Sequence, residues 1–212
     1  MDPGVHWDTI YRTKPPHQLS WFQAEPRTSL DLIRRAVPNV NAAIIDVGGG
    51  ASTLVDRLLS AGYRRLTVLD LSPSALETAR GRLGPRAGDV TWMEADVLTA
   101  DLPPRHFELW HDRAVFHFLT AAADRARYVD QVRTALRPGG HVIVATFADD
   151  GPTRCSGLPV VRYTPAGLAE EFGEAFRLAD SAREEHVTPS GVRQAFAYAL
   201  CRMESNTVAV ND

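Results

Sequence analysis

The stretch Ile44-Ile45-Asp46-Val47-Gly48-Gly49-Gly50-Ala51-Ser52-Thr53 decides the fold of this chain. An apolar run ends in an acid, continues through consecutive glycines and passes into a segment typical of a helix. This order predicts a buried strand that leads through a tight turn to a helix N-terminus. Glycine lacks a Cβ atom and tolerates positive φ, so the turn suits a ligand that approaches the backbone closely. The N–H groups at the helix start favour polar or anionic groups of that ligand.

The acid before the glycines narrows the class of ligand. A dinucleotide-binding turn packs around a pyrophosphate, and the carboxylate of Asp46 would be unfavourable beside those negative charges. A ligand with an amine or a cationic centre would suit this carboxylate better. The third glycine of the dinucleotide pattern G-x-G-x-x-G is also missing, because position 53 is Thr. A nicotinamide-dependent enzyme on a related sheet is therefore disfavoured. It stays open as an alternative, as does a cofactor-binding protein without catalysis.

Length and composition predict one domain over residues 1–204, followed by a frayed tail at 205–212. The net charge of −3 argues against a large nucleic-acid interface. No apolar run approaches the roughly 18 residues of a membrane-spanning helix, and residues 1–10 lack the pattern of a signal peptide. The two cysteines, Cys155 and Cys201, make no disulfide framework, which favours a cytoplasmic location.

Hydrophobic patterns typical of strands and helices alternate along the chain. The predicted helices cover residues 28–37, 52–61, a segment capped by Ser72, about residues 121–136 and a short segment from Thr164. The predicted strands cover residues 42–47, 66–70, 90–94, 106–112, 141–147, 176–182 and 192–203. Residues 136–140, Leu-Arg-Pro-Gly-Gly, are expected to form a turn. This order predicts an α/β fold: a doubly wound, mostly parallel sheet with helices on both faces and an antiparallel C-terminal hairpin.

Polar residues stand at the carboxyl ends of the predicted parallel strands, where ligands bind in sheets of this kind. They are Asp46, Asp70, Asp96, His111 and Asp112. Asp70 follows the glycines by about 20 residues, which is the spacing of a carboxylate that hydrogen-bonds a ribose. Asp96 can accept a hydrogen bond from the exocyclic amine of adenine. Two other interpretations stay open: Asp70 merely ends a strand, and Asp96 caps the turn that follows it.

Residues 1–26 form an N-terminal arm rich in aromatic side chains and interrupted by prolines. Trp7, Tyr11, Trp21 and Phe22 are too many large rings for a solvated segment, so they must pack on the rest of the chain. The arm either covers an edge of the core or forms a lid over a ligand pocket, where its rings flank an apolar or cationic group. Both interpretations can hold at once.

Four motifs in order resemble those of the class I S-adenosylmethionine-dependent methyltransferases. Asp46-Val-Gly48-Gly-Gly50 looks like the D-x-G-x-G loop of this family, Leu69-Asp70 like its ribose-binding acid, and Glu94-Ala-Asp96-Val97 like its adenine site. Leu136-Arg-Pro-Gly-Gly140 looks like the turn before its fifth strand. The resemblance runs from about residue 40 to 148. It implies a Rossmann-like, seven-stranded sheet that ends in an antiparallel hairpin.

The resemblance also implies the cofactor, S-adenosylmethionine, which leaves as S-adenosylhomocysteine. Asp46 then serves the methionyl amine, Gly48, Gly49 and Gly50 pack against the cofactor, and Asp70 takes the ribose hydroxyls. The other residues placed at the cofactor are Leu71, Asp96, Val97 and His111, with Trp7, Tyr11 and Trp21 from the arm. The arm is similar to that of the small-molecule branch near thiopurine and tellurite methyltransferases, where it closes over the methionine part of the cofactor. It also resembles bacterial proteins related to lysine methyltransferases.

Two positions depart from the family pattern. Ser52 or Thr53 replaces the third loop glycine of many relatives. After the fourth strand the chain has His111-Asp112-Arg113 instead of the Asn-Pro-Pro-Tyr of enzymes that methylate amino groups and nucleic acids. The second departure argues against DNA adenine as the acceptor.

The implied chemistry is an in-line displacement at a methyl group bonded to a sulfonium, which needs positioning, exclusion of water and, for some acceptors, a base. The candidate catalytic residues are His111, Asp112, His117 and His186. An alternative interpretation, which is equally open, is that these side chains hydrogen-bond the backbone and have no catalytic role. No spacing of metal ligands is present, and Cys155 has no paired base nearby in sequence that would make it a nucleophile.

We therefore expect a methyltransferase that acts on a small-molecule acceptor through an S, N or O nucleophile, as a monomer or weak homodimer, without nucleic acid or membrane. Two alternatives are a protein lysine methyltransferase and a non-catalytic protein that binds S-adenosylmethionine. Four residues could bind an acidic group of the acceptor or belong to solvated surface: Arg113, Arg154, Arg162 and Tyr163.

Overall fold

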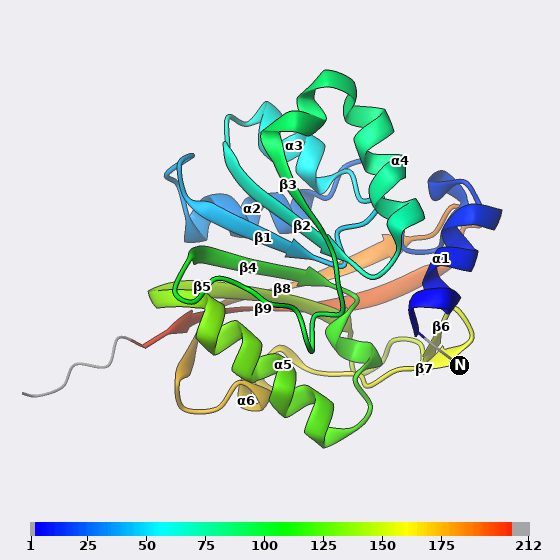
Figure 1. Ribbon diagram of the computed structural model, residues 1–212. Coiled ribbons are helices and arrows are strands. Elements are labelled where there is room, and N and C mark those ends of the chain that lie inside the picture. Colours follow the sequence, from blue (N-terminus) through cyan, green and yellow to red (C-terminus); the bar gives the residue numbers. More distant parts are fainter. Residues whose placement is uncertain (1–2, 205–212) are drawn as a thin grey trace, which may run out of the picture.

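The computed structural model describes residues 3–204, so the expected frayed tail at 205–212 lies outside the described residues. Seven strands form one sheet in the order β3-β2-β1-β4-β5-β9-β8 (Figure 1). Their bounds are β1 Ala43–Val47, β2 Arg65–Asp70, β3 Val90–Glu94, β4 Phe107–Arg113, β5 Leu136–Phe147, β8 Phe176–Val187 and β9 Arg193–Met203. The first five run parallel, and β9 is antiparallel to both β5 and β8. The predicted fold class is confirmed.

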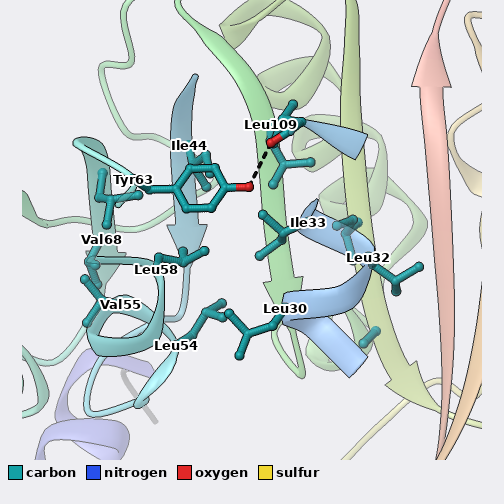
Figure 2. Close-up of a cluster of buried hydrophobic side chains, with 14 of the residues drawn as sticks. Leu30, Leu32, Ile33, Ile44, Leu54, Val55, Leu58, Tyr63, Val68 and Leu109 are labelled. Atoms are coloured by element: carbon teal, nitrogen blue, oxygen red, sulfur yellow. Dashed lines mark hydrogen bonds between the residues drawn. The ribbon is translucent and has the colours of Figure 1, made fainter. Parts of the chain in front are cut away.

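Helices cover both faces of this sheet. One layer contains α2 (Arg27–Ala36), α3 (Leu54–Ser60) and α4 (Pro73–Leu83), and the opposite layer contains α5 (Ala122–Ala135) and α6 (Pro165–Glu171). Each layer has its own apolar core against the sheet. Figure 2 shows the first of them, in which side chains of α2 and α3 meet β1 and the Tyr63 hydroxyl donates a hydrogen bond of 2.8 Å to the carbonyl of Val37.

The central strand is apolar because both of its faces are covered. Ile44 packs in the core under α2 and α3, and the next residue, Ile45, packs in the core under α5. Successive side chains of a strand point to opposite faces, and a parallel strand between two helical layers needs apolar residues on both. All five residues of β1 are buried, Asp46 included.

Several smaller elements gather at the carboxyl end of the parallel strands. They are helix α1 (Pro3–Thr13), a single 3-10 turn (Pro16–Gln18), a second 3-10 turn (Phe116–Phe118) and the hairpin β6–β7 (Arg154–Cys155 and Leu158–Pro159). In Figure 1, α1 and the hairpin lie beside the end of the sheet at which β1 and β4 terminate. These segments enclose the space beyond the strand ends.

Three details of the predicted elements differ from the structure. Residues 136–140 belong to β5, and the register against β4 is irregular between Phe107 and Leu109. Gly139 has a φ of +78° there, so the Pro-Gly-Gly sequence distorts a strand and does not form a separate turn. Strand β8 extends five residues beyond the predicted end at 182, because its alternating polar side chains suit a sheet edge. Helix α5 covers residues 122–135 instead of the predicted 121–136, and Ala121 before it makes no side-chain cap.

Within residues 3–204, the helices are all too short or too polar to cross a membrane.

Candidate functional site

The loop after β1 passes between two buried carboxylates. A Cβ atom at Gly49 would lie 2.6 Å from Asp46 Oδ2, and one at Gly50 would lie 2.5 Å from Asp70 Oδ2. Gly48 has a φ of +67°, and a Cβ there would come within 2.1 Å of the Val115 side chain. Close contacts therefore favour glycine at all three positions, and the positive φ of Gly48 and Gly50 adds to this preference.

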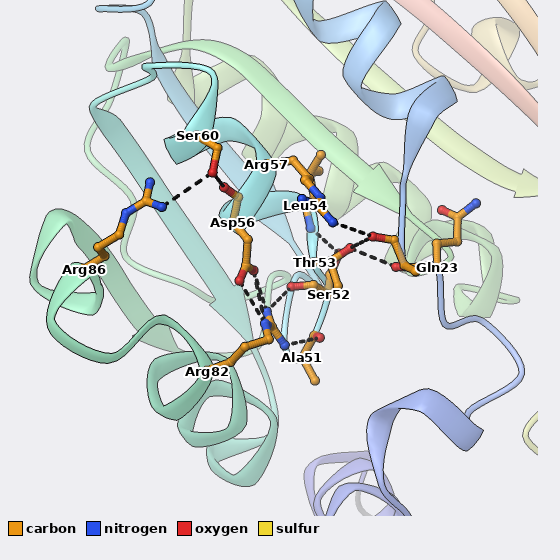
Figure 3. Close-up of polar contacts among 11 residues, drawn as sticks. Gln23, Ala51, Ser52, Thr53, Leu54, Asp56, Arg57, Ser60, Arg82 and Arg86 are labelled. Carbon is orange, nitrogen blue, oxygen red and sulfur yellow. Dashed lines mark hydrogen bonds and ion pairs between the residues drawn. The ribbon is translucent and has the colours of Figure 1, made fainter.

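Arg82 of α4 holds the second half of this loop. Its guanidinium donates hydrogen bonds of 2.9 Å and 2.6 Å to the carbonyls of Ala51 and Ser52, and it also pairs with Asp56 of α3 at 2.7 Å (Figure 3). From the other side, the Thr53 hydroxyl donates to the carbonyl of Gln23 at 2.8 Å. The loop is thus fixed to α4 and to the N-terminal arm. The sequence analysis did not identify Arg82, since nothing local marks its distant carbonyl partners.

A cavity of about 350 Å³ opens beyond the strand ends. One wall consists of Gly48 after β1, Asp70 and Leu71 after β2, and Asp96 and Val97 after β3. Three more of the predicted cofactor-binding residues line this cavity: Trp7, Tyr11 and Trp21. Another three line a smaller cavity next to it: Asp46, Gly49 and His111. Gly50 packs on the Asp70 carboxylate behind the wall. The cavity thus brings together the motifs that the sequence places far apart.

Asp70 is buried at the end of β2. The backbone N–H of Ser72 donates to Asp70 Oδ1 at 2.8 Å, and Ser72 caps α4 by accepting from the N–H of Ala75. Burial raises the pKa of Asp70 to about 7, although hydrogen bonds from the backbone act in the opposite direction. A buried acceptor on a cavity wall suits a ligand that brings hydroxyl donors.

Asp96 fits both of its interpretations. Its Oδ1 accepts from the N–H of Leu98 at 2.9 Å, which makes it a cap of the following turn. The residue also lines the cavity beside Val97. One carboxylate can do both because each of its oxygens accepts hydrogen bonds independently.

The aromatic side chains of the arm enter the cavity from the side opposite the strand ends. The Trp7 ring packs edge to face against Trp21 and Phe118, with centroids 5.8 Å and 5.0 Å apart. The Trp21 indole N–H donates to the Tyr11 hydroxyl at 3.2 Å. Helix α1 has no buried residue of its own, and its rings, which pack on Trp21 and Phe118, line the cavity.

The smaller cavity, of about 50 Å³, lies next to the first and is polar on one side. Asp46 and His111 line it together, and their side chains are hydrogen-bonded at 2.7 Å. They are direct neighbours because β1 and β4 pair in parallel with Asp46 opposite His111. Ser29 of α2 completes the contact, with its hydroxyl 2.9 Å from the other ring nitrogen of His111.

Three of the four candidate bases lie outside the lining of both cavities. Asp112 points to the α5 face, where it accepts from the Tyr128 hydroxyl at 2.6 Å and from the N–H groups of Val115 and Phe116; burial raises the pKa of its carboxyl to about 6. His117 is fully buried, and burial lowers its pKa to about 3. Neither of these two side chains lines either cavity.

His186 is also held away from the cavities. Its Nε2 is 2.7 Å from the carbonyl oxygen of Ser20, and burial lowers its pKa. It therefore ties β8 to the arm. His111 alone among the four candidates borders a cavity, and both of its ring nitrogens already have partners.

The predicted acidic-group binders also separate. Arg113 lines both cavities, but it is committed to the Trp21 carbonyl, the Tyr198 hydroxyl and Glu184. Arg154 and Arg162 are exposed and Tyr163 is buried, and none of the three lines either cavity.

The sequence analysis missed the apolar wall that faces the strand ends. It is made of side chains from the segment after β4 and from the β6–β7 hairpin: Val115, Phe118, Leu119, Cys155, Leu158 and Pro159. These residues lie in segments without a periodic pattern, so no local feature marked them as cavity residues.

Comparison with known families places the site in context. Residues 45–142 match the family described as "Methyltransferase domain". The ubiquinone biosynthesis O-methyltransferase of Xylella fastidiosa is 30% identical over 144 residues, which cover 66% of this chain and 54% of that protein. The eEF1A lysine and N-terminal methyltransferase of Danio rerio is 21% identical over 148 residues, 68% of this chain and 21% of that protein. The chain thus spans about half or less of the length of these two relatives.

Solved structures agree in fold. A protein studied for the conversion of a disulfide bond into a thioacetal group during echinomycin biosynthesis superposes with a TM-score of 0.77 at 20% identity, over 98% of this chain and 95% of that one. The 1,6-didemethyltoxoflavin N1-methyltransferase of Burkholderia thailandensis, solved with S-adenosylhomocysteine, superposes with a TM-score of 0.68 at 22% identity, over 84% and 78%. The predicted resemblance is confirmed, and these matches support the predicted class of enzyme and its cofactor.

Proposed function

We propose that this chain, whose residues 45–142 match a methyltransferase domain family, transfers the methyl group of S-adenosylmethionine to a small-molecule acceptor. The observation that carries the proposal is the 350 Å³ cavity at the strand ends, with Asp70 and Asp96 on one wall and the rings of the arm on the other. Side chains of α1 cover this cavity, and we propose that α1 acts as its lid.

The residues present fit the cofactor. Asp46 Oδ2 is buried without a hydrogen-bond partner among the described residues, as expected of an acceptor that awaits the methionyl amine. Asp70 would offer a buried carboxylate to the ribose hydroxyls, and Asp96 with Val97, which line the same cavity, would bind the adenine. The glycine loop leaves no room for a Cβ atom between the two acids. The methionyl amine, the ribose hydroxyls and the exocyclic amine of adenine would thus each meet an acceptor of matching hydrogen-bonding character.

When bound, S-adenosylmethionine supplies a methyl group on a good neutral leaving group. The protein then has to hold the acceptor in line with that methyl group and exclude water. Trp7, Phe118 and Leu158 form an apolar wall that can do both. Because His111 has both ring nitrogens engaged, we propose that proton removal does not rely on it and that the acceptor loses its proton to solvent before it enters the pocket.

The size of the cavity favours a small acceptor. Ligand pockets of about 300–1,000 Å³ bury one drug-sized molecule, and this cavity lies near the lower end of that range. A cofactor would occupy most of this volume, so the room beside it suits a compact acceptor better than a polypeptide segment, which needs an open groove. A protein acceptor remains the second candidate, since one relative is by its name a lysine and N-terminal methyltransferase.

We also propose that the chain acts in the cytoplasm as a monomer or weak homodimer. Its reaction, as proposed, involves no nucleic acid. The buried thiols of Cys155 and Cys201, which form no disulfide with each other, are compatible with a reducing compartment.

The test supplies methyl-labelled S-adenosylmethionine to the purified protein with either the low-molecular-weight fraction or the macromolecular fraction of a cell extract. We expect label in products of the first fraction. Asp70→Ala should lower that transfer at least about tenfold, whereas Asp89→Ala, an exposed acid at the opposite end of β3, should match the wild type. Label in polypeptides would support the lysine-type alternative. Transfer to neither fraction, by a protein that still binds S-adenosylhomocysteine, would indicate binding without catalysis.

A further inference from the structure

Three polar side chains form a buried chain beside the glycine loop. Ser29 of α2, His111 of β4 and Asp46 of β1 are 1%, 2% and 5% exposed. The Ser29 hydroxyl is 2.9 Å from His111 Nε2, and His111 Nδ1 is 2.7 Å from Asp46 Oδ1. All three residues border the smaller cavity. The chain of contacts therefore links the helical layer to the loop that faces the cofactor.

Hydrogen-bond chemistry fixes the direction of these contacts. An ionised carboxylate only accepts, so the Nδ1–H of His111 donates to Asp46 Oδ1. In the neutral imidazole Nε2 is then an acceptor, and the Ser29 hydroxyl donates to it. Asp46 Oδ2 is left without a partner in residues 3–204. Such an oxygen is costly to bury unless a ligand supplies a donor.

We propose that His111 is a positioning residue that acts through Asp46, and that its protonation weakens cofactor binding. Neutral His111 pins one oxygen of Asp46 and leaves the other free, with its full negative charge, for the cationic amine of the ligand. This proposal rests on the proposed function, because it assigns how the same site is set up and regulated.

Protonation of His111 would act on charge and on geometry together. The imidazolium would form an ion pair with Asp46 and reduce the attraction of that carboxylate for a second cation. Nε2–H would also become a donor, so the Ser29 hydroxyl would have to turn away. The charged groups around the pair are Asp46 on β1, Asp70 on β2, and Asp112 and Arg113 on β4.

The test measures the affinity for S-adenosylhomocysteine by calorimetry, between about pH 8 and about pH 5.5, in the wild type and in His111→Asn and His111→Ala. Asparagine keeps an N–H donor near Asp46 but does not titrate. The carboxyls of Asp70 and Asp112 also titrate in this range, with pKa values of about 7 and about 6, and both are present in all three proteins. The difference between the wild-type and His111→Asn profiles therefore isolates His111.

We expect His111→Ala to weaken binding about tenfold at pH 8, and His111→Asn to restore affinity to within about threefold. Between about pH 8 and about pH 5.5, the wild type should lose about tenfold more affinity than His111→Asn. Superimposable profiles of these two proteins would overturn the proposal and leave the proposed function intact. Absence of binding to the wild type would overturn both. If His111→Ala does not fold, the comparison of wild type with His111→Asn decides alone.

The same three residue types in this order also occur in serine hydrolases. Here the adjoining cavity of about 50 Å³ has no room for an ester substrate beside Ser29. A fluorophosphonate probe separates the two roles: we expect no label on Ser29, and covalent labelling would contradict the positioning role.

Discussion

The rim of the sheet and helix α1 face the same cavity, but they are held in different ways. Asp46, Asp70 and His111 are each no more than 7% exposed and are fixed by strand pairing and packing on both faces. Helix α1 has no buried residue. Its polar links to the body include Asp8, which accepts from the Ser72 hydroxyl at 3.0 Å and from the N–H of Ser74 at 3.1 Å, and Tyr11, whose hydroxyl accepts from the Trp21 indole N–H at 3.2 Å. The rim is therefore preformed, whereas α1 is attached by few contacts.

The segment that follows α1 is attached much more firmly. The carbonyls of Ser20 and Trp21 accept from His186 and Arg113, and the Gln23 side chain donates to Glu184 at 2.8 Å. Leu19 is 3% exposed. A hinge between Thr13 and Leu19 would allow α1 to move while the segment after it stays in place. Binding determinants on the rim should therefore affect affinity strongly, and contacts of α1 should affect it less.

The largest effect is expected at the rim. Asp70→Ala should weaken S-adenosylmethionine binding at least about tenfold, because the ribose hydroxyls lose a buried acceptor. The fold should stay intact, as judged by circular dichroism. Calorimetry measures the change, and unaltered affinity would remove Asp70 from the site.

Asp70 should also limit stability above neutral pH. Burial raises its folded pKa to about 7, above the ordinary value of 3.8, so the folded state binds the proton more tightly than the unfolded state. Its contribution to stability is fully present at low pH and is lost as the pH rises through about 7. Asp70→Asn should therefore raise the thermal midpoint at pH 8 by about 5 °C, on the order of 2 kcal/mol. The gain should disappear near pH 4; a constant gain would contradict the linkage.

Helix α1 should contribute less through its rings. Trp7→Ala should weaken cofactor binding about fivefold, since the indole covers the cavity and packs on Trp21 and Phe118. Trp7→Phe keeps an aromatic cover and serves as the matched control, with a loss of about twofold. An effect of Trp7→Ala as large as that of Asp70→Ala would show that lid and rim contribute equally.

The smallest effect is expected at the link between α1 and α4. Asp8→Ala should weaken binding about threefold through loss of two hydrogen bonds. Limited proteolysis should cut α1 faster in this variant, and S-adenosylhomocysteine should slow the cut. Equal cleavage rates in variant and wild type would show that Asp8 does not hold α1.

The sheet and the main rim residues were predictable because their patterns are local. The apolar run of β1, the glycines and the acids at the carboxyl ends of β1, β2 and β3 can be identified without knowing their neighbours. The roles of His111 and Asp112 were not separable in this way. They are consecutive in β4 and point to opposite faces, so only one of them borders a cavity. The alternation of side chains along a strand shows that His111 and Asp112 cannot both border the same cavity, but it does not indicate which of the two does.

The remaining features depend on contacts between distant segments. Ser29 meets His111 across 82 positions of sequence, and Arg82 holds carbonyls of the loop more than a helix away. The apolar wall at Phe118 and Leu158 comes from irregular loops. No periodicity or motif marks such residues, because their partners are chosen by the packing of the whole fold.

The central claim is that the cavity at the strand ends binds the adenosyl cofactor. Calorimetric titration of the purified chain with S-adenosylmethionine, S-adenosylhomocysteine and NAD in parallel tests it most directly. We predict dissociation constants on the order of micromolar for the two adenosyl ligands and no heat of binding with NAD. Silence from both adenosyl ligands, or binding of NAD in their place, would contradict the assignment of this site.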